Sequence, residues 1–148
     1  MSCAAIIVAA GRSQRMGFDK MLSSLGGRPV LQWSLDAFLE AEEVETVVVV
    51  TSSERFAQLD QGSGTTVLRA EGDEERYLSV IRGLEALPPA TKYVAVHDGA
   101  RPLVLPSQID DVVRTARDRG AAALALSLIH ISEPTRPLYI SYAVFCLK

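Results

Sequence analysis

One run of the chain, Thr46 to Thr51, consists entirely of β-branched residues: two threonines enclose four valines. A strand with one face in water alternates apolar and polar side chains, whereas a strand of a parallel sheet that is covered on both faces is apolar throughout. Parallel neighbours are joined by long crossover connections, usually helices. This run therefore predicts an α/β fold with a buried parallel sheet.

Strand-like and helix-like patterns alternate from Ile6 to Leu126. Strands are expected at residues 6–9, 46–51, 65–69 and 93–97, and a further one starts at residue 121. Helices are expected at residues 30–39, 52–59, 78–87 and 106–119. This strict alternation predicts a doubly wound, mostly parallel, Rossmann-like sheet, in which ligands bind beyond the carboxyl ends of the strands.

The 148 residues suit a single domain, and their 48% hydrophobic and 22% charged content is ordinary for a globular protein. A net charge of -3 gives no basic field for a nucleic acid or an anionic membrane, so an anion site has to be local. The sequence shows no apolar stretch of membrane-spanning length and no basic segment before its first apolar run. Cys3 and Cys146 have no metal-ligand spacing, and we expect a cytoplasmic protein.

The first predicted strand runs directly into small residues and then into cations. The small side chains of Ala9-Ala10-Gly11 let backbone N–H groups approach phosphate oxygens. Positive charge follows at Arg12, Arg15 and Lys20. The pattern indicates an anion site, and the alternative is an ordinary strand-to-loop turn with solvated basic residues.

A second motif, Glu71 to Val80, places a cation and a hydroxyl at the start of a predicted helix. Arg76 can contact a base or a phosphate, and Ser79 can donate a hydrogen bond to a base edge. The alternative is a solvated, acidic helix start, where carboxylates interact favourably with the helix dipole.

The third motif, His97 to Pro102, follows another apolar strand. An aspartate in this place, here Asp98, is a frequent Mg²⁺ ligand, because Mg²⁺ takes one or two carboxylates together with substrate phosphates. Gly99 lets a ligand approach the backbone, and Arg101 can pair with Asp98 or with a phosphate. The alternative is an Asp-Gly turn held by a structural salt bridge, and His97 is interpreted as an orienting or packed histidine.

Together the three motifs resemble the 2-C-methyl-D-erythritol 4-phosphate cytidylyltransferases of the non-mevalonate isoprenoid pathway. The resemblance covers residues 4 to about 125 and is most specific at His97–Pro102. The matching residues are Ala9-Ala10-Gly11, Arg15-Met16-Gly17, Lys20, Leu25–Leu31, Arg76, Ser79-Val80, Gly83-Leu84 and Val96–Pro102. The resemblance implies a sheet of the nucleotidyltransferase type and a transfer of CMP from CTP to methylerythritol phosphate, with release of pyrophosphate and with Mg²⁺ as cofactor.

When the roles of the family's residues are transferred by position, the resemblance implies that Ala9, Ala10 and Gly11 line the nucleotide. It implies that Ser79 and the turn from Gly72 to Arg76 hold cytosine and ribose.

The same resemblance assigns the charged groups. Arg15 and Lys20 would stabilise charge on the α-phosphate and on the leaving pyrophosphate. Asp98 would bind Mg²⁺, Gly99 would sit close to the ribose or the metal, and Arg101 would face the second substrate.

The sequence also departs from the family pattern. Asp19-Lys20-Met21 stands where the family commonly has Pro-Lys-Gln, and the second glycine that the family usually has near Ser13 is missing. Family members continue well beyond the strand at Ala121, with a threonine-containing arm that swaps across a homodimer, with cations for the second substrate and with a second metal-binding aspartate. We therefore expect a fragment that is truncated at its C-terminal side, lacks the dimer arm and has little or no activity.

Residues 126–148 differ in pattern and composition from the rest of the chain, because they show no clean helical or strand period and contain no glycine. Leu126–Arg136 and Ile140–Lys148 resemble the two ends of a sequencing-library adapter, read through in one translation frame. The predicted organisation is therefore a nucleotide-binding part of a nucleotidyltransferase domain, residues 1–125, and a non-native tail, residues 126–148. Re-sequencing of the source DNA is expected to replace everything after Ala125.

The sequence also allows functions other than this one. A related CDP-alcohol or molybdopterin nucleotidyltransferase would share the first loop but would vary the segment His97–Pro102. A nucleotide-binding module without catalysis is the alternative of a different class. A Rossmann-type dehydrogenase is disfavoured, because no G-x-G-x-x-G follows the first strand and the second strand closes on Thr51 rather than on an acidic residue.

Overall fold

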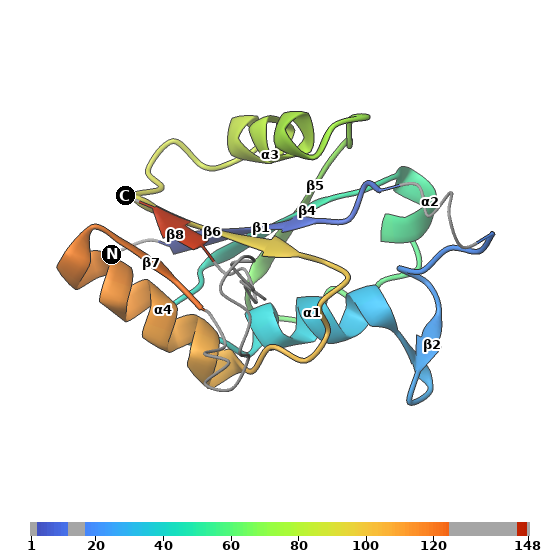
Figure 1. Ribbon diagram of the computed structural model, residues 1–148, viewed down its shortest axis with the longest axis horizontal. Coiled ribbons are helices and arrows are strands. Elements are labelled where there is room, and N and C mark those ends of the chain that lie inside the picture. Colours follow the sequence, from blue (N-terminus) through green and yellow to red (C-terminus); the bar gives the residue numbers. More distant parts are fainter. Residues whose placement is uncertain (1–2, 12–16, 125–144, 148) are drawn as a thin grey trace, which may run out of the picture.

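The computed structural model describes residues 3–11, 17–124 and 145–147 of the chain. They form a sheet of six strands in the order β5-β4-β1-β6-β8-β7, with a separate small hairpin of β2 and β3 (Figure 1). The strands are β1 (Cys3–Val8), β2 (Ser24–Leu25), β3 (Arg28–Pro29), β4 (Thr46–Val50), β5 (Thr66–Ala70), β6 (Tyr93–Asp98), β7 (Ala121–Ala123) and β8 (Phe145–Leu147). The helices are α1 (Val30–Leu39), α2 (Ser53–Phe56), α3 (Arg76–Glu85) and α4 (Pro106–Arg119).

Four strands of the sheet are parallel, as predicted. β1 lies in the middle and pairs in parallel with β4 on one side and with β6 on the other, and β4 pairs in parallel with β5. The register aligns the last residues of these strands, since Val8 is the partner of both Val50 and Asp98, and Val50 is the partner of Ala70. The segments that follow β1, β4, β5 and β6 therefore leave the sheet at the same edge.

β8 is the exception to the parallel pattern. It lies between β6 and β7 and is antiparallel to both. β7, which begins the strand predicted at residue 121, forms the edge of the sheet. β8 belongs to the predicted tail, whose division from the domain stays a prediction because residues 125–144 lie outside the described part of the chain.

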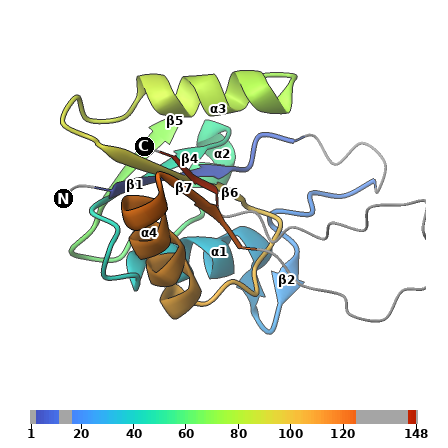
Figure 2. The same ribbon diagram turned by 60° about the vertical axis from the view of Figure 1, so that its left-hand side comes forward.

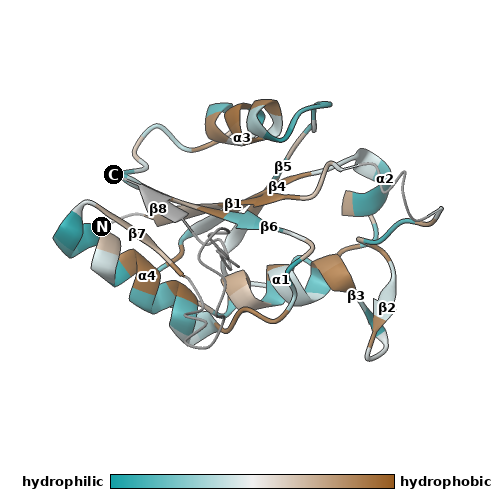
Figure 3. Cartoon of the chain, viewed as in Figure 1, coloured by the Kyte–Doolittle hydropathy of each residue, from teal (hydrophilic) through white to brown (hydrophobic). Residues whose placement is uncertain are grey.

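The helices cover both faces of the sheet. α3 lies on one face, and α1 and α4 lie on the other (Figure 1), an arrangement that Figure 2 shows from a second direction. β1 serves both layers: Ala5 and Ile7 belong to the core on the side of α1 and α4, and Ile6 and Val8 belong to the core under α3. Figure 3 shows the resulting distribution, with the hydrophobic colour gathered on the central strands.

Local signals set the ends of the helices. α1 begins directly after Pro29, and α4 has Pro106 in its first turn, where the missing N–H of proline is not needed. The Gln108 side chain accepts a hydrogen bond from the Leu105 N–H at 3.0 Å, and α4 ends at Gly120, whose φ of 91° suits glycine. Among the described residues, no helix is long and apolar enough to cross a membrane.

α3 packs on the sheet through small residues. Its buried positions are Ser79 and Gly83, whereas Ile81 and Leu84 of the predicted apolar stripe are 44% and 45% exposed. A Cβ atom on Gly83 would lie 2.6 Å from Cγ2 of Ile6, so the helix approaches the sheet too closely for a larger side chain.

Candidate functional site

The loop after β1 is enclosed by one glycine from each of the other two motifs. A Cβ atom on Gly72 would lie 2.0 Å from the Cβ of Ala10, and a Cβ atom on Gly99 would lie 3.1 Å from the Cβ of Ala9. The Gly99 N–H also donates to the Val8 carbonyl at 2.9 Å. The three segments that the sequence singled out thus meet at one edge of the sheet, and the close packing accounts for both glycines without a ligand.

Two polar side chains that follow β4, those of Thr51 and Arg55, donate hydrogen bonds to the carbonyl groups of this loop. The Ala9 carbonyl accepts hydrogen bonds from Thr51 Oγ1 at 3.2 Å and from Arg55 Nη1 at 2.7 Å. Arg55, in α2, also donates from Nη2 to the Gly11 carbonyl at 3.2 Å. Arg55 was not predicted from the sequence as a site residue, although it lies just beyond the carboxyl end of β4, where ligands of such sheets bind.

Lys20 lies in a turn that its two neighbours anchor. One oxygen of Asp19, Oδ1, accepts a hydrogen bond from the Met21 N–H at 3.0 Å, and the other, Oδ2, pairs with Arg55 Nε at 2.6 Å. Met21 is buried in the core, and its carbonyl accepts a hydrogen bond from the Leu31 N–H. The backbone on both sides of the exposed Lys20 is therefore held in place by its neighbours Asp19 and Met21. Arg15, the other predicted phosphate ligand, lies outside the described residues.

The second motif forms a closed turn before α3. Ser79 is 1% exposed, and its Oγ accepts a hydrogen bond from the Asp73 N–H at 3.0 Å and donates one to the Asp73 carbonyl at 3.3 Å. A hydroxyl has only one hydrogen to donate, so in this geometry Ser79 shapes the Gly72-Asp73 turn. Arg76, at the first position of α3, is exposed.

The third motif is a turn fastened to α1. Asp98 Oδ1 accepts a hydrogen bond from the Ala100 N–H at 3.1 Å, and the Gly99 carbonyl accepts one from Ser34 Oγ at 2.9 Å. The buried His97 ring lies 5.1 Å from the Phe38 ring, centroid to centroid, and its Nε2 is 3.1 Å from the Arg101 carbonyl oxygen. This places His97 as a packed, orienting residue, as predicted.

The Asp98 carboxylate fits a cation that brings ligands of its own. Its Oδ2 lies 3.7 Å from Arg101 Nε, which is an ion pair but too long for a hydrogen bond. Within the described part of the chain, no group of three or more His, Cys, Asp or Glu side chains could hold a metal ion. A single carboxylate suits Mg²⁺, which retains waters and binds substrate phosphates, better than a metal that needs a closed protein cage.

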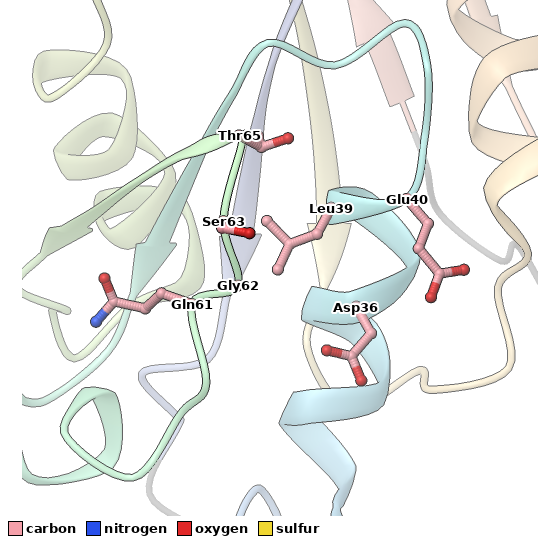
Figure 4. A pocket seen from close by; sticks show the side chains of 7 residues that line it. All are labelled: Asp36, Leu39, Glu40, Gln61, Gly62, Ser63 and Thr65. Carbon is pink, nitrogen blue, oxygen red and sulfur yellow. The ribbon is translucent and has the colours of Figure 1, made fainter.

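A pocket elsewhere in the molecule does not belong to this site. It lies between Asp36 and Leu39 of α1, the next residue Glu40, and the loop Gln61–Thr65 (Figure 4). That loop leads into the first residue of β5, so the pocket is at the amino ends of the strands, away from the three motifs.

The 2-C-methyl-D-erythritol 4-phosphate cytidylyltransferase family model matches residues 3–132. The chain belongs to this family. The match begins close to the predicted residue 4 and extends seven residues past the predicted limit near 125.

Two curated cytidylyltransferases illustrate the likeness in sequence. The 2-C-methyl-D-erythritol 4-phosphate cytidylyltransferase of Caldanaerobacter subterraneus subsp. tengcongensis is 37% identical over an alignment of 134 residues, and the match covers 85% of this chain and 59% of that protein. The enzyme of the same name from Pelotomaculum thermopropionicum is 42% identical over an alignment of 131 residues, and the match covers 83% of this chain and 55% of its own length. The chain thus spans little more than half the length of these relatives.

The fold of the cytidylyltransferase family is also the fold found here. The crystal structure of the Thermus thermophilus enzyme of the same name superposes with a TM-score of 0.72 at 28% identity. The superposition covers 99% of this chain and 70% of that one. The predicted α/β sheet of nucleotidyltransferase type is confirmed.

Proposed function

We propose that these residues are the nucleotide-binding part of an enzyme that transfers CMP from CTP to methylerythritol phosphate and releases pyrophosphate. The observation that carries the proposal is the packing of Gly72 and Gly99 against Ala10 and Ala9, which gathers all three motifs at the carboxyl edge of the sheet. Membership of the cytidylyltransferase family points to the same reaction.

In the proposed reaction a phosphate oxygen of the second substrate attacks the α-phosphorus of CTP. A new P–O bond forms, the bond from the α-phosphorus to the bridging oxygen breaks, and pyrophosphate leaves with the electron pair. No covalent enzyme intermediate is needed, so the residues act by orienting the groups and by neutralising charge.

Lys20 is proposed to neutralise charge on the triphosphate from its anchored turn, together with Arg15. The backbone of Ala9-Ala10-Gly11 is proposed to follow the phosphates and the ribose. Because the Ser79 hydroxyl is bonded to Asp73, we assign contacts with the base to the backbone of the Gly72-Asp73 turn rather than to this hydroxyl.

Asp98 is the residue proposed to hold Mg²⁺, which would offset the negative charge of the phosphate oxygens. The long contact with Arg101 leaves the carboxylate oxygen Oδ2 accessible to a cation. Arg101 is proposed to turn toward the phosphate of the second substrate, where a guanidinium forms bidentate hydrogen bonds. For the full-length enzyme we also propose a homodimer and a cytoplasmic location, which a measurement of mass in solution and cell fractionation test.

The test compares nucleotides on the 148-residue chain. Calorimetric titration with Mg²⁺ present is expected to show binding of CTP and at least about tenfold weaker binding of GTP, as a site that recognises one base requires. Equal affinity for the two nucleotides, or preference for GTP, would contradict the proposal and favour a guanylyltransferase. Pyrophosphate release with both substrates is expected to be absent or very low for these residues alone.

A further inference from the structure

One guanidinium joins three parts of the loop that follows β1. Arg55 Nε donates to Asp19 Oδ2 at 2.6 Å, Nη1 donates to the Ala9 carbonyl at 2.7 Å, and Nη2 donates to the Gly11 carbonyl at 3.2 Å. The side chain of Arg55 is only 13% exposed. All three nitrogens are thus directed at protein acceptors, an arrangement that the planar fork of arginine permits and a lysine ammonium cannot span.

These contacts set the orientation of the loop backbone. In a trans peptide the N–H points away from the C=O, and no cis peptide occurs among the described residues. With the Ala9 carbonyl turned toward Arg55 and Thr51, the Ala10 N–H is directed to the opposite side of the chain. A loop that binds an anion needs its N–H groups presented in this way.

The same guanidinium fixes the place of Lys20. Asp19 is held through one carboxylate oxygen by Arg55, and its other oxygen holds the Met21 N–H. Lys20 lies between these two fixed residues. Arg55 therefore ties the beginning of the segment, at Ala9 and Gly11, to its end at Asp19.

We infer that Arg55 is a positioning residue for the triphosphate of a nucleotide. By joining Ala9 and Gly11 to Asp19, it closes the two described ends of this segment on each other and sets the distance between the Ala10 backbone and the Lys20 ammonium group. Its own charge is offset by Asp19, so it does not serve as a phosphate ligand. The inference rests on the proposed function for the nature of the ligand, whereas the closure of the segment rests on the hydrogen bonds alone.

The test uses Arg55→Lys, which keeps the charge but loses the fork, and Asp19→Asn, which removes the ion pair. Arg119→Lys, at the exposed end of α4, is the matched control. Titration with CTP and with CMP, in the presence of Mg²⁺, separates the triphosphate from the rest of the nucleotide. We expect about tenfold weaker CTP binding for both variants, with CMP affinity changed less than about twofold, because charge-assisted hydrogen bonds that orient the loop are lost.

Amide hydrogen exchange of Met21, whose N–H donates to Asp19 Oδ1, is measured on the same proteins without nucleotide. Faster exchange in both variants, with unchanged exchange in β4, supports the closure. An unaltered ratio of CTP to CMP affinity in a folded Arg55→Lys protein overturns the positioning role while leaving the proposed function intact. If the unsubstituted chain binds no CTP, the proposed nucleotide site fails, and unchanged exchange in the variants then overturns the closure as well.

Discussion

The Ser79 hydroxyl makes two hydrogen bonds to the backbone of Asp73: its Oγ accepts one from the Asp73 N–H at 3.0 Å and donates one to the Asp73 carbonyl at 3.3 Å. Both groups lie where the chain turns from β5 into α3. The turn that carries the proposed base contacts thus depends on a side chain six residues further along.

Ser79→Ala is expected to lower the free energy of unfolding by about 1–3 kcal/mol, because the Asp73 N–H and C=O lose a buried partner. Chemical denaturation followed by circular dichroism measures this. Ser107→Ala, at an exposed position of α4, is the control and should have little effect. Equal stability of the Ser79→Ala protein and the unsubstituted chain would show that water replaces the hydroxyl without cost.

Gly72→Ala tests the contact between the second motif and the first loop. A Cβ atom 2.0 Å from the Ala10 Cβ forces the two segments apart, and such overpacking costs about 1–3 kcal/mol. Gly72 does not have a positive φ, so the predicted loss of stability comes from the steric contact alone and not from backbone strain. Melting curves of the single variants and of the Gly72→Ala/Ala10→Gly double variant should show a favourable coupling, because the second change removes the methyl group that clashes.

Gly83→Ala serves as the comparison for CTP binding. It also places a methyl group in a crowded position, 2.6 Å from Ile6 Cγ2, but within the core under α3. We expect it to destabilise the chain without altering the CTP affinity of the folded fraction, whereas Gly72→Ala should weaken both. Identical effects of the two variants on CTP affinity would separate Gly72 from the site.

Asp98→Asn is expected to remove the dependence of CTP binding on Mg²⁺. Asparagine keeps an oxygen for the Ala100 N–H but loses the charge that a divalent cation needs. Titration with and without Mg²⁺ should show a gain of about tenfold or more for the unsubstituted chain and almost none for the variant. Asp118→Asn, on the exposed face of α4, should behave like the unsubstituted chain; an undiminished Mg²⁺ effect in Asp98→Asn would remove Asp98 from the proposed metal site.

Glu43 makes the stability of the chain depend on pH. Partial burial raises the pKa of its carboxyl, but hydrogen bonds and positive charge from Arg114 and Arg117 outweigh burial, and the pKa is lowered from the ordinary value of 4.5. A lowered pKa in the folded state means that the stabilisation is fully present above pH 4.5 and is lost as the pH falls through the folded-state pKa.

Glu43→Gln should therefore lower the melting temperature at neutral pH, and the difference from the unsubstituted chain should shrink in acid. Melting curves between neutral pH and the acid range check this. Glu45→Gln, an exposed neighbour in the same connection, is the control. A difference that stays constant through the acid range would mean that Glu43 titrates as an ordinary glutamate.

The parallel sheet could be predicted because its signal is local. Four consecutive valines in β4 can only be buried on both faces, and the alternation of strands and helices then determines the layers. The buried face of α3 could not be predicted in the same way. Ile81 and Leu84 are exposed because the helix contacts Ile6 through Gly83. The hydrophobic pattern of a helix does not indicate how closely the helix packs against a sheet. The antiparallel β8 had no signal in the sequence either.

The site likewise has a part that the sequence predicts and a part that it does not. That Asp98 and the first loop share one edge follows from the ends of parallel strands, and the structure confirms it. Arg55 was missed because its partners Ala9 and Gly11 lie more than forty residues earlier, so that no short motif contains the contact. The Asp19 that departs from the family pattern acquires its meaning only with Arg55 beside it.

The contact between Ala10 and Gly72 also constrains how the two segments can vary during evolution. Position 72 can gain a side chain only if position 10 gives up its methyl group, although more than sixty residues separate the two positions in the chain. Substitutions at the two positions should therefore be correlated across homologous sequences, with an enlarged residue at 72 tolerated only where glycine occupies position 10. A substitution at position 72 alone should therefore be rare among homologues that keep alanine at position 10.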